Sequence, residues 1–165
     1  MYLLDANVFI EAKNRYYGFD LAPGFWDWLD AAAELGAIGS VRAVGDELVR
    51  GSDELAHWAR AHPEAFFEPD AAVAAKLADV AVWANAQDFT AAAVSEFLGV
   101  ADYQLIAHAA AHGHTIVTHE QPQAGAKRRV LIPNVCLALG VDFCNTFTML
   151  RSHSVQLDLR LTSAS

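Results

Sequence analysis

No stretch of this sequence is apolar for long enough to cross a membrane, because charged residues interrupt every hydrophobic run within a few positions. The opening residues also lack the basic segment and the extended apolar segment of a secretory leader, since Asp5 and Asn7 interrupt the apolar residues there. These absences argue against a membrane-spanning or exported protein, and we expect a cytoplasmic location.

Cysteine is scarce: the chain has two, Cys136 and Cys144, at a spacing that matches no common zinc pattern. Cytoplasmic thiols are usually reduced, and free cysteines are commonly buried as small hydrophobic residues. We therefore predict that both are buried thiols rather than a disulfide or a metal site.

Positive charge is also in short supply, with 11 Lys and Arg residues against 20 Asp and Glu residues and a net charge of -9. This balance argues against a protein that coats nucleic acid by neutralising its phosphates. It is compatible with an enzyme that touches a few phosphates through a bound metal ion, and with a basic partner. The densest positive run is Lys127-Arg128-Arg129.

The pattern of apolar residues predicts one α/β domain. A chain of 165 residues with 54% hydrophobic residues can bury its own core. Helical patterns separate the predicted strands, which implies crossover connections and a mainly parallel sheet. The predicted strands span residues 2–5, 37–40, 115–118 and 141–143. The predicted helices span about 8–16 (capped by Asn7), 23–35, 41–50 (capped by Ser40), 54–61, 71–86, 89–98, 101–111, 134–139 and 146–151.

The predicted domain covers residues 1–151 and includes a helical segment at about 52–98. A tail at 152–165 follows, and its alternating apolar residues suggest a strand at the edge of the sheet or against another chain.

Two acids follow predicted strands, and two lie in neighbouring helices. Asp5 ends the first strand, and Glu120 follows the strand at 115–118. Glu47 lies one to two turns into the helix after the strand at 37–40, and Asp102 begins the helix before the strand at 115–118. Ligands bind at the carboxyl ends of the strands in open α/β sheets, so we expect these acids to share one crevice.

Acids gathered in one crevice repel one another and require a cation, and carboxylate oxygens suit Mg²⁺. A bound metal polarises phosphate and lowers the pKa of water, and hydrolysis of a phosphodiester needs both effects. Taken singly, Asp102 is also typical of a helix cap and Glu47 of a solvated helix face. Asp5 is harder to explain in that way, since a buried carboxylate without a partner is costly.

The segment at residues 3–9 resembles the opening of PIN-domain nucleases, where an acid at the end of a strand binds metal. Residues 44–49 and 101–107 resemble the helices that carry the second and third acids of that family, and residues 117–120 fall where the fourth acid lies. The resemblance extends from residue 1 to about 151, and it is closest to a PIN-like branch described only as a domain of unknown function.

The resemblance implies a three-layer α/β/α sandwich and an endoribonuclease that depends on Mg²⁺ or Mn²⁺. Asp5, Glu47 and Asp102 would hold the principal metal, and Glu120 would complete the site directly or through water. Asn7, Ser40 and Thr118 would position acids or waters. Many small members of the family are toxins of type II toxin–antitoxin modules, so the resemblance also implies a small antitoxin partner and a homodimer.

Neighbouring residues offer alternatives to this assignment. Asp46 is a rival for Glu47, although Glu47 better matches the family's helix. His119 precedes Glu120 and is a candidate contact for phosphate or a leaving group, and Arg42 is a candidate for holding the RNA backbone. The family's fourth acid is Asp, so Glu120 is a departure that leaves the number of metal ions open.

Other functions compete with the nuclease hypothesis. A degenerate PIN-like domain would bind RNA or a protein without cleaving it, and a different metal-dependent phosphatase or nuclease would use a similar sheet. His108 and His112 are four residues apart, as in some zinc sites, but the usual Glu between them is absent. Phe25 and Trp26 are more typical of a core or dimer interface than of base stacking.

Overall fold

The computed structural model describes residues 1–158, and its centre is a parallel five-stranded sheet in the order β3-β2-β1-β4-β5. The mainly parallel sheet predicted from the sequence is therefore confirmed. The strands are β1 (Tyr2–Leu4), β2 (Ile38–Val41), β3 (Phe66–Phe67), β4 (Thr115–Val117) and β5 (Phe143–Cys144).

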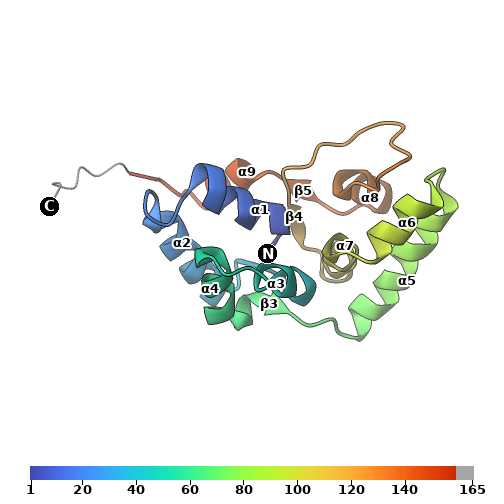
Figure 1. Cartoon of the computed structure of the whole chain (residues 1–165). Coiled ribbons are helices and arrows are strands. Elements are labelled where there is room, and N and C mark those ends of the chain that lie inside the picture. The colour runs from blue at the N-terminus through green and yellow to red at the C-terminus, as the bar shows by residue number, and fades with distance from the viewer. Residues whose placement is uncertain (159–165) are drawn as a thin grey trace, which may run out of the picture.

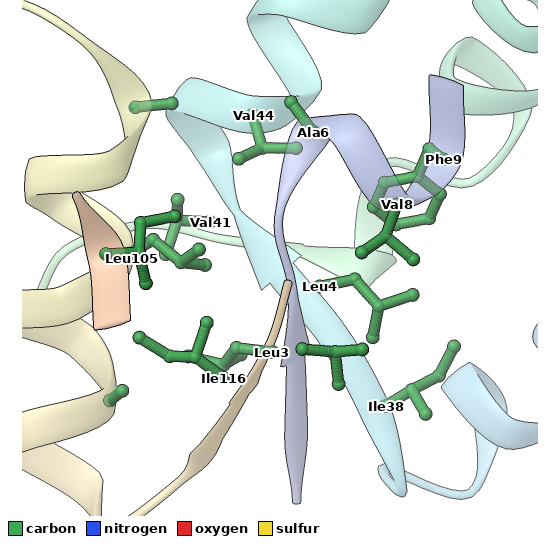
Figure 2. Close-up of a cluster of buried hydrophobic side chains, with 14 of the residues drawn as sticks. Leu3, Leu4, Ala6, Val8, Phe9, Ile38, Val41, Val44, Leu105 and Ile116 are labelled. Carbon is green, nitrogen blue, oxygen red and sulfur yellow. The ribbon is translucent and has the colours of Figure 1, made fainter. Parts of the chain in front are cut away.

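Helices cover both faces of this sheet. Successive side chains of a strand point to opposite faces, and both Leu3 and Leu4 of β1 have no exposed surface. In Figure 1, α1 and α2 lie on one side of the strands, and α7, α5 and α6 lie on the other. Figure 2 shows both leucines among apolar side chains that include Ile38 of β2 and Leu105 of α7.

The predicted helices are present, and several of their ends are shifted. In the described residues they are α1 (Ala6–Glu11), α2 (Pro23–Glu34), α3 (Arg42–Leu48), α4 (Glu54–Ala61), α5 (Ala71–Ala86), α6 (Ala91–Leu98), α7 (Ala101–His112), α8 (Ile132–Leu139) and α9 (Thr146–Ser152). A π-helical segment, η1 (Ala12–Tyr16), extends α1, and a short 3-10 helix, η2 (Pro63–Ala65), precedes β3.

The predicted caps of α1 and α3 are wrong. Asp5 caps α1, and its side chain accepts a hydrogen bond from the Asn7 amide. The residue before α3 is Val41, and Ser40 is instead a residue of β2 whose hydroxyl donates to the carbonyl of Leu4 at 2.6 Å. Helix α1 begins two residues earlier than expected, so Asn7 lies within its first turn, and α3 begins one residue later than expected, so Ser40 stays in the sheet.

The predicted helical segment at 52–98 contains α4, α5 and α6 together with a strand that the sequence pattern did not indicate. The two residues of β3, Phe66 and Phe67, pair with Ser40 and Val41 of β2. Helix α5 packs along α7, and the Tyr103 hydroxyl donates to the Leu77 carbonyl at 2.6 Å. This segment therefore extends the sheet at one edge and covers α7.

The start of the predicted edge strand is not formed. Residues 155–158 have no regular secondary structure, and the Val155 amide donates to the carbonyl of Leu150 in α9. The remainder of that prediction, at 159–165, lies outside the described residues. Within residues 1–158, no helix combines the length and apolar character needed to cross a membrane.

The sequence interpretation is confirmed for Cys136 and for two aromatic residues, and in part for Cys144. Cys136 and Cys144 are free thiols, the first buried and the second half-buried. Burial raises the pKa of the Cys136 thiol to about 12, so this group stays protonated. Phe25 and Trp26 are buried in the core, where they are not available to stack on bases.

Candidate metal-dependent active site

The candidate site lies where the order of the strands reverses. After β1 the chain adds β2 and β3 on one side, and β4 and β5 lie on the other side of β1. The carboxyl ends of strands at such a point form the usual ligand crevice of an open α/β sheet. Asp5 directly follows β1, and its amide donates to the Val117 carbonyl at the end of β4 at 3.0 Å.

Asp5 is a buried carboxylate with protein partners on both sides. The residue is 1% exposed, and its side chain accepts hydrogen bonds from the Thr118 hydroxyl at 3.0 Å and the Asn7 amide at 3.4 Å. Burial raises the pKa of Asp5, and the charges of Glu120 and Glu47 raise it further, while the two hydrogen bonds oppose the shift. The hydrogen bonds therefore hold the carboxylate in place, but they do not fully offset the rise in its pKa that burial causes.

Three of the four predicted acids line one pocket of about 180 Å³. Asp5 comes from the end of β1, Glu47 from α3 and Asp102 from the first turn of α7. The pocket is also lined by Ala6, Asn7, Ala93, Glu96, Phe97, Val100, Arg129 and Val130. The expectation that separate elements bring acids to one crevice therefore holds for these three residues.

Asp102 has the most perturbed carboxyl group of the site. Burial raises its pKa to about 7, with further increases from the charges of Asp5, Glu120 and Glu47, while the charge of Arg129 lowers it. Asp102 does not cap α7, because Val100 precedes that helix and no side chain accepts a hydrogen bond there. The plain interpretation of Asp102 as a helix cap is therefore wrong.

Glu120 lies beside the pocket and has protein partners for both of its oxygens. Oε1 accepts a hydrogen bond from Arg129 Nη2 at 2.6 Å, and Oε2 accepts one from the Ile132 amide at 2.8 Å. The Glu120 amide donates to the Thr118 hydroxyl at 3.1 Å. Glu120 therefore links Arg129, through its side chain, to Thr118 and Asp5, through its backbone amide.

Of the residues predicted to support the acids, Asn7 and Thr118 contact the site, whereas Ser40 and His119 do not line the pocket. Thr118 bonds to Asp5, and Asn7 lines the pocket. Ser40 is buried below the site on the Leu4 carbonyl. His119 lies within hydrogen-bonding distance of Thr146, with 3.2 Å between Nε2 and Oγ1.

Arg42 and Asp46 belong to a different surface. They form an ion pair at 2.8 Å, and a second pocket that they line shares no residue with the acidic pocket. Arg42 also pairs with Glu68 at 3.5 Å. Of the two neighbouring acids on α3, Glu47 is therefore the one in the acidic pocket.

The donor set suits a hard divalent cation, but the side chains are not arranged to hold one. Mg²⁺ and Mn²⁺ prefer oxygen ligands, which Asp5, Glu47 and Asp102 supply. No group of three or more His, Cys, Asp or Glu residues within residues 1–158 is placed so that it could hold a metal ion. Coordination therefore requires a rearrangement of side chains, for which the exposed Glu47 is the least constrained.

The absence of a preformed metal-binding group within residues 1–158 also applies to the alternative zinc site at His108 and His112. The rings of His108 and His112 lie 4.8 Å apart between centroids, and His112 Nε2 lies 3.1 Å from an oxygen of Asp70. His108 is buried against Phe67. This histidine cluster lies on a different part of α7 from Asp102, and among the described residues it forms no metal centre.

Two charged residues of the pocket, Glu96 and Arg129, were not predicted from the sequence. Glu96 lies on α6 within the long helical segment, and its position near Asp102 follows only from the packing of α6 on α7. Arg129 belongs to the densest positive run of the sequence, which was a usable signal, but nothing in that run separates Arg129 from Arg128.

Comparison with known protein families identifies one family to which the chain belongs. The family model described as "Domain of unknown function (DUF4411)" matches residues 2–157, and the chain belongs to this family. No curated protein and no solved structure matches the chain.

Proposed function

We propose that this chain is a Mg²⁺- or Mn²⁺-dependent endoribonuclease of the PIN-like type. The observation that carries the proposal is the convergence of Asp5, Glu47 and Asp102 on one pocket at the carboxyl end of the central strand. Three different elements supply these acids, and a fold does not need to bring carboxylates together for stability, because they repel one another.

The order of the acids along the chain supports the finer family assignment. The parallel sheet and the acid directly after β1 are consistent with a PIN-like domain. The second acid lies on α3 and the third at the start of α7, in the order that the resemblance implies.

The residues of the pocket have distinct roles in the proposed reaction. When bound, the cation supplies a Lewis acid that polarises the phosphate and lowers the pKa of water. Thr118 and the Asn7 amide keep the Asp5 carboxylate in one orientation. Burial and the neighbouring carboxylates raise the pKa of Asp102 to about 7 in the metal-free site, so a cation would compete with a proton for this carboxylate at lower pH.

The proposed biological role is that of a toxin in a type II toxin–antitoxin module. This part of the proposal, with a small antitoxin and a homodimer as partners, is supported by the resemblance to small PIN-domain proteins. Its test is purification of the chain together with the product of the adjacent gene, followed by measurement of the mass of the complex.

A second candidate function is a degenerate PIN-like module that binds RNA or protein without cleaving it. Two observations favour it: Glu120 has protein partners for both oxygens, and the described acids are not placed to hold an ion. If the chain is such a module, it should still bind its RNA or protein partner after the acids of the pocket are replaced by amides.

The two candidates are separated by a cleavage assay on structured and single-stranded RNAs with Mg²⁺, Mn²⁺ or EDTA. Asp5→Asn retains an oxygen that can accept from Thr118, so the variant is expected to fold while losing cleavage. Asp46→Asn is the matched control, because Asp46 lies outside the pocket on the same helix as Glu47. Binding of RNA without metal-dependent cleavage would favour the degenerate module.

A further inference from the structure

Glu120 differs from the other acids of the site because the protein already uses both of its oxygens. Arg129 Nη2 and the Ile132 amide are the donors, and the Glu120 side chain is 11% exposed. An ionised carboxylate in such a position forms strong, charge-assisted hydrogen bonds. A metal ion would have to compete with both donors for this carboxylate.

Arg129 differs from Glu120 in exposure, because its side chain is 62% exposed and lines the acidic pocket. Among the described residues that line this pocket, Arg129 is the single Lys or Arg. Its charge reaches the interior of the site, since it lowers the pKa of Asp102. Arg129 therefore brings positive charge to the edge of a site that otherwise repels anions.

A phosphodiester that enters this pocket meets the acids Asp5, Glu47, Glu96 and Asp102. Anions approach such a site only with compensating positive charge, and a guanidinium matches phosphate oxygens with paired N–H donors. The bond to Glu120 occupies Nη2, and a guanidinium has further N–H donors for a ligand.

The partners of Glu120 place Arg129 relative to the reacting centre. The Glu120 amide and the Asp5 carboxylate share the Thr118 hydroxyl, and the Ile132 amide holds the second oxygen of Glu120. The Glu120 backbone is thus fixed on Thr118 beside Asp5, and its carboxylate, held by the Ile132 amide, holds the guanidinium.

We propose that Arg129 binds a phosphodiester group of the RNA at the rim of the pocket, and that Glu120 is the positioning residue that holds Arg129 there rather than a metal ligand. The identity of the anion rests on the proposed nuclease function. The pairing of Glu120 with Arg129 is independent of it.

The first test compares Arg129→Ala with Arg128→Ala in steady-state cleavage of a single-stranded RNA. Arg128 is the matched control, because it is adjacent, exposed and does not line the pocket. Arg129→Ala is expected to raise KM about tenfold, the effect of losing one charge-assisted contact, and Arg129→Lys to raise it less. The dependence of log affinity on log salt should become shallower by about 0.7 for Arg129→Ala.

The second test asks whether Glu120 holds Arg129 or the metal. Glu120→Gln is expected to raise KM for RNA without changing the Mg²⁺ concentration that gives half-maximal rate. The double variant with Arg129→Ala should have the KM of Arg129→Ala alone, because both changes remove one interaction. A large shift in half-saturating Mg²⁺ with unchanged KM would overturn the inference and make Glu120 a ligand.

Equal effects of Arg128→Ala and Arg129→Ala on KM, or no effect of either, would also overturn the inference while leaving the nuclease intact. Should the parent protein cleave no RNA, inorganic phosphate is titrated while the Arg129 side-chain signal is followed by NMR. A saturable shift that Glu120→Gln weakens would support the anion site without the nuclease. No shift in the folded parent would overturn the site.

Discussion

The Thr118 hydroxyl connects two acids of the candidate site. It donates to Asp5 at 3.0 Å and accepts from the Glu120 amide at 3.1 Å, and Thr118 is 1% exposed. Since water does not reach this group freely, removing it leaves one acceptor and one donor without a partner.

Thr118→Val, which has nearly the same shape, is therefore expected to lower the free energy of unfolding by about 1–3 kcal/mol, measured by urea denaturation. Thr118→Ser is the control, because it keeps the hydroxyl and should lose less. A valine variant as stable as the parent would contradict the assigned hydrogen bonds.

The raised pKa of Asp102 makes the stability of the folded protein depend on pH. The pKa of its carboxyl is 3.8 as an ordinary acid and about 7 in the folded protein. Between these two pH values, folding takes up a proton, so the stability of the protein falls as pH rises through this window. Above about 7 the carboxylate is charged in both states, and the cost of holding it in the fold is fully present.

We predict that Asp102→Asn unfolds at higher urea than the parent at pH 8 in the absence of divalent metal. The expected gain is at least about 1.4 kcal/mol, the equivalent of one pKa unit. This gain should shrink when both proteins are compared at pH 5. A variant that is less stable than the parent at pH 8 would contradict the assigned charge repulsion.

At the scale of elements, the approach of α3 to β3 places Glu47. Gly45 lies on α3, and a Cβ there would meet the Phe66 ring at 2.7 Å. Phe66 is buried and cannot move aside without disturbing the core. Glu47 is two residues further along this helix, so the glycine sets how closely the helix brings that acid to the pocket.

Gly45→Ala is expected to cost about 1–3 kcal/mol by overpacking and to weaken Mn²⁺ binding by displacing Glu47. Gly24→Ala on α2 is the control, since a Cβ there meets nothing within 4 Å. This control should be neutral or more stable in the same urea and metal titrations. Unchanged stability and Mn²⁺ affinity in Gly45→Ala would contradict the role of the close contact.

Apolar patterning made much of this fold predictable from the sequence. The strands at β1, β2 and β4 and the full extent of α5 follow from runs and periods of apolar residues. The two-residue strand β3 did not, because Phe66 and Phe67 gain their pairing only from β2. The cap of α3 shifted because the Ser40 hydroxyl bonds to Leu4 of the neighbouring strand, and the cap of α1 shifted because the Asp5 side chain accepts from the Asn7 amide.

The candidate site was predictable where chemistry and strand ends coincide. Asp5 and Thr118 flank buried strands, and their meeting follows from the pairing of β1 with β4. Glu96 and Arg129 enter the pocket through helix packing and a loop conformation, which no local pattern records. The partner of Glu120 was hidden for the same reason, because Arg129 lies in the loop that returns past it.

At the scale of the whole molecule, the net charge of -9 limits how the chain can bind RNA. The described basic residues are largely paired with acids, as Lys13 is with Asp53 and Arg42 is with Asp46. Binding to phosphates over a broad surface is therefore not expected, and contacts should be few.

We predict a slope of about -0.7 to -1.4 for log affinity against log salt on single-stranded RNA, equivalent to one or two phosphate contacts. The measurement uses Asp5→Asn to prevent cleavage and is made without divalent metal. A slope steeper than about -3 would mean that a broad cationic surface binds the RNA.

The central claim is that the acidic pocket binds a divalent cation, and calorimetric titration with Mn²⁺ at pH 8 tests it most directly. Trace contaminating nuclease can mimic cleavage, but it cannot mimic stoichiometric metal binding. We predict saturable binding in the parent and in Asp46→Asn, loss of binding in Asp5→Asn, and weaker binding below the Asp102 pKa of about 7. Absence of binding in the folded parent, or equal binding in Asp5→Asn, would contradict the claim.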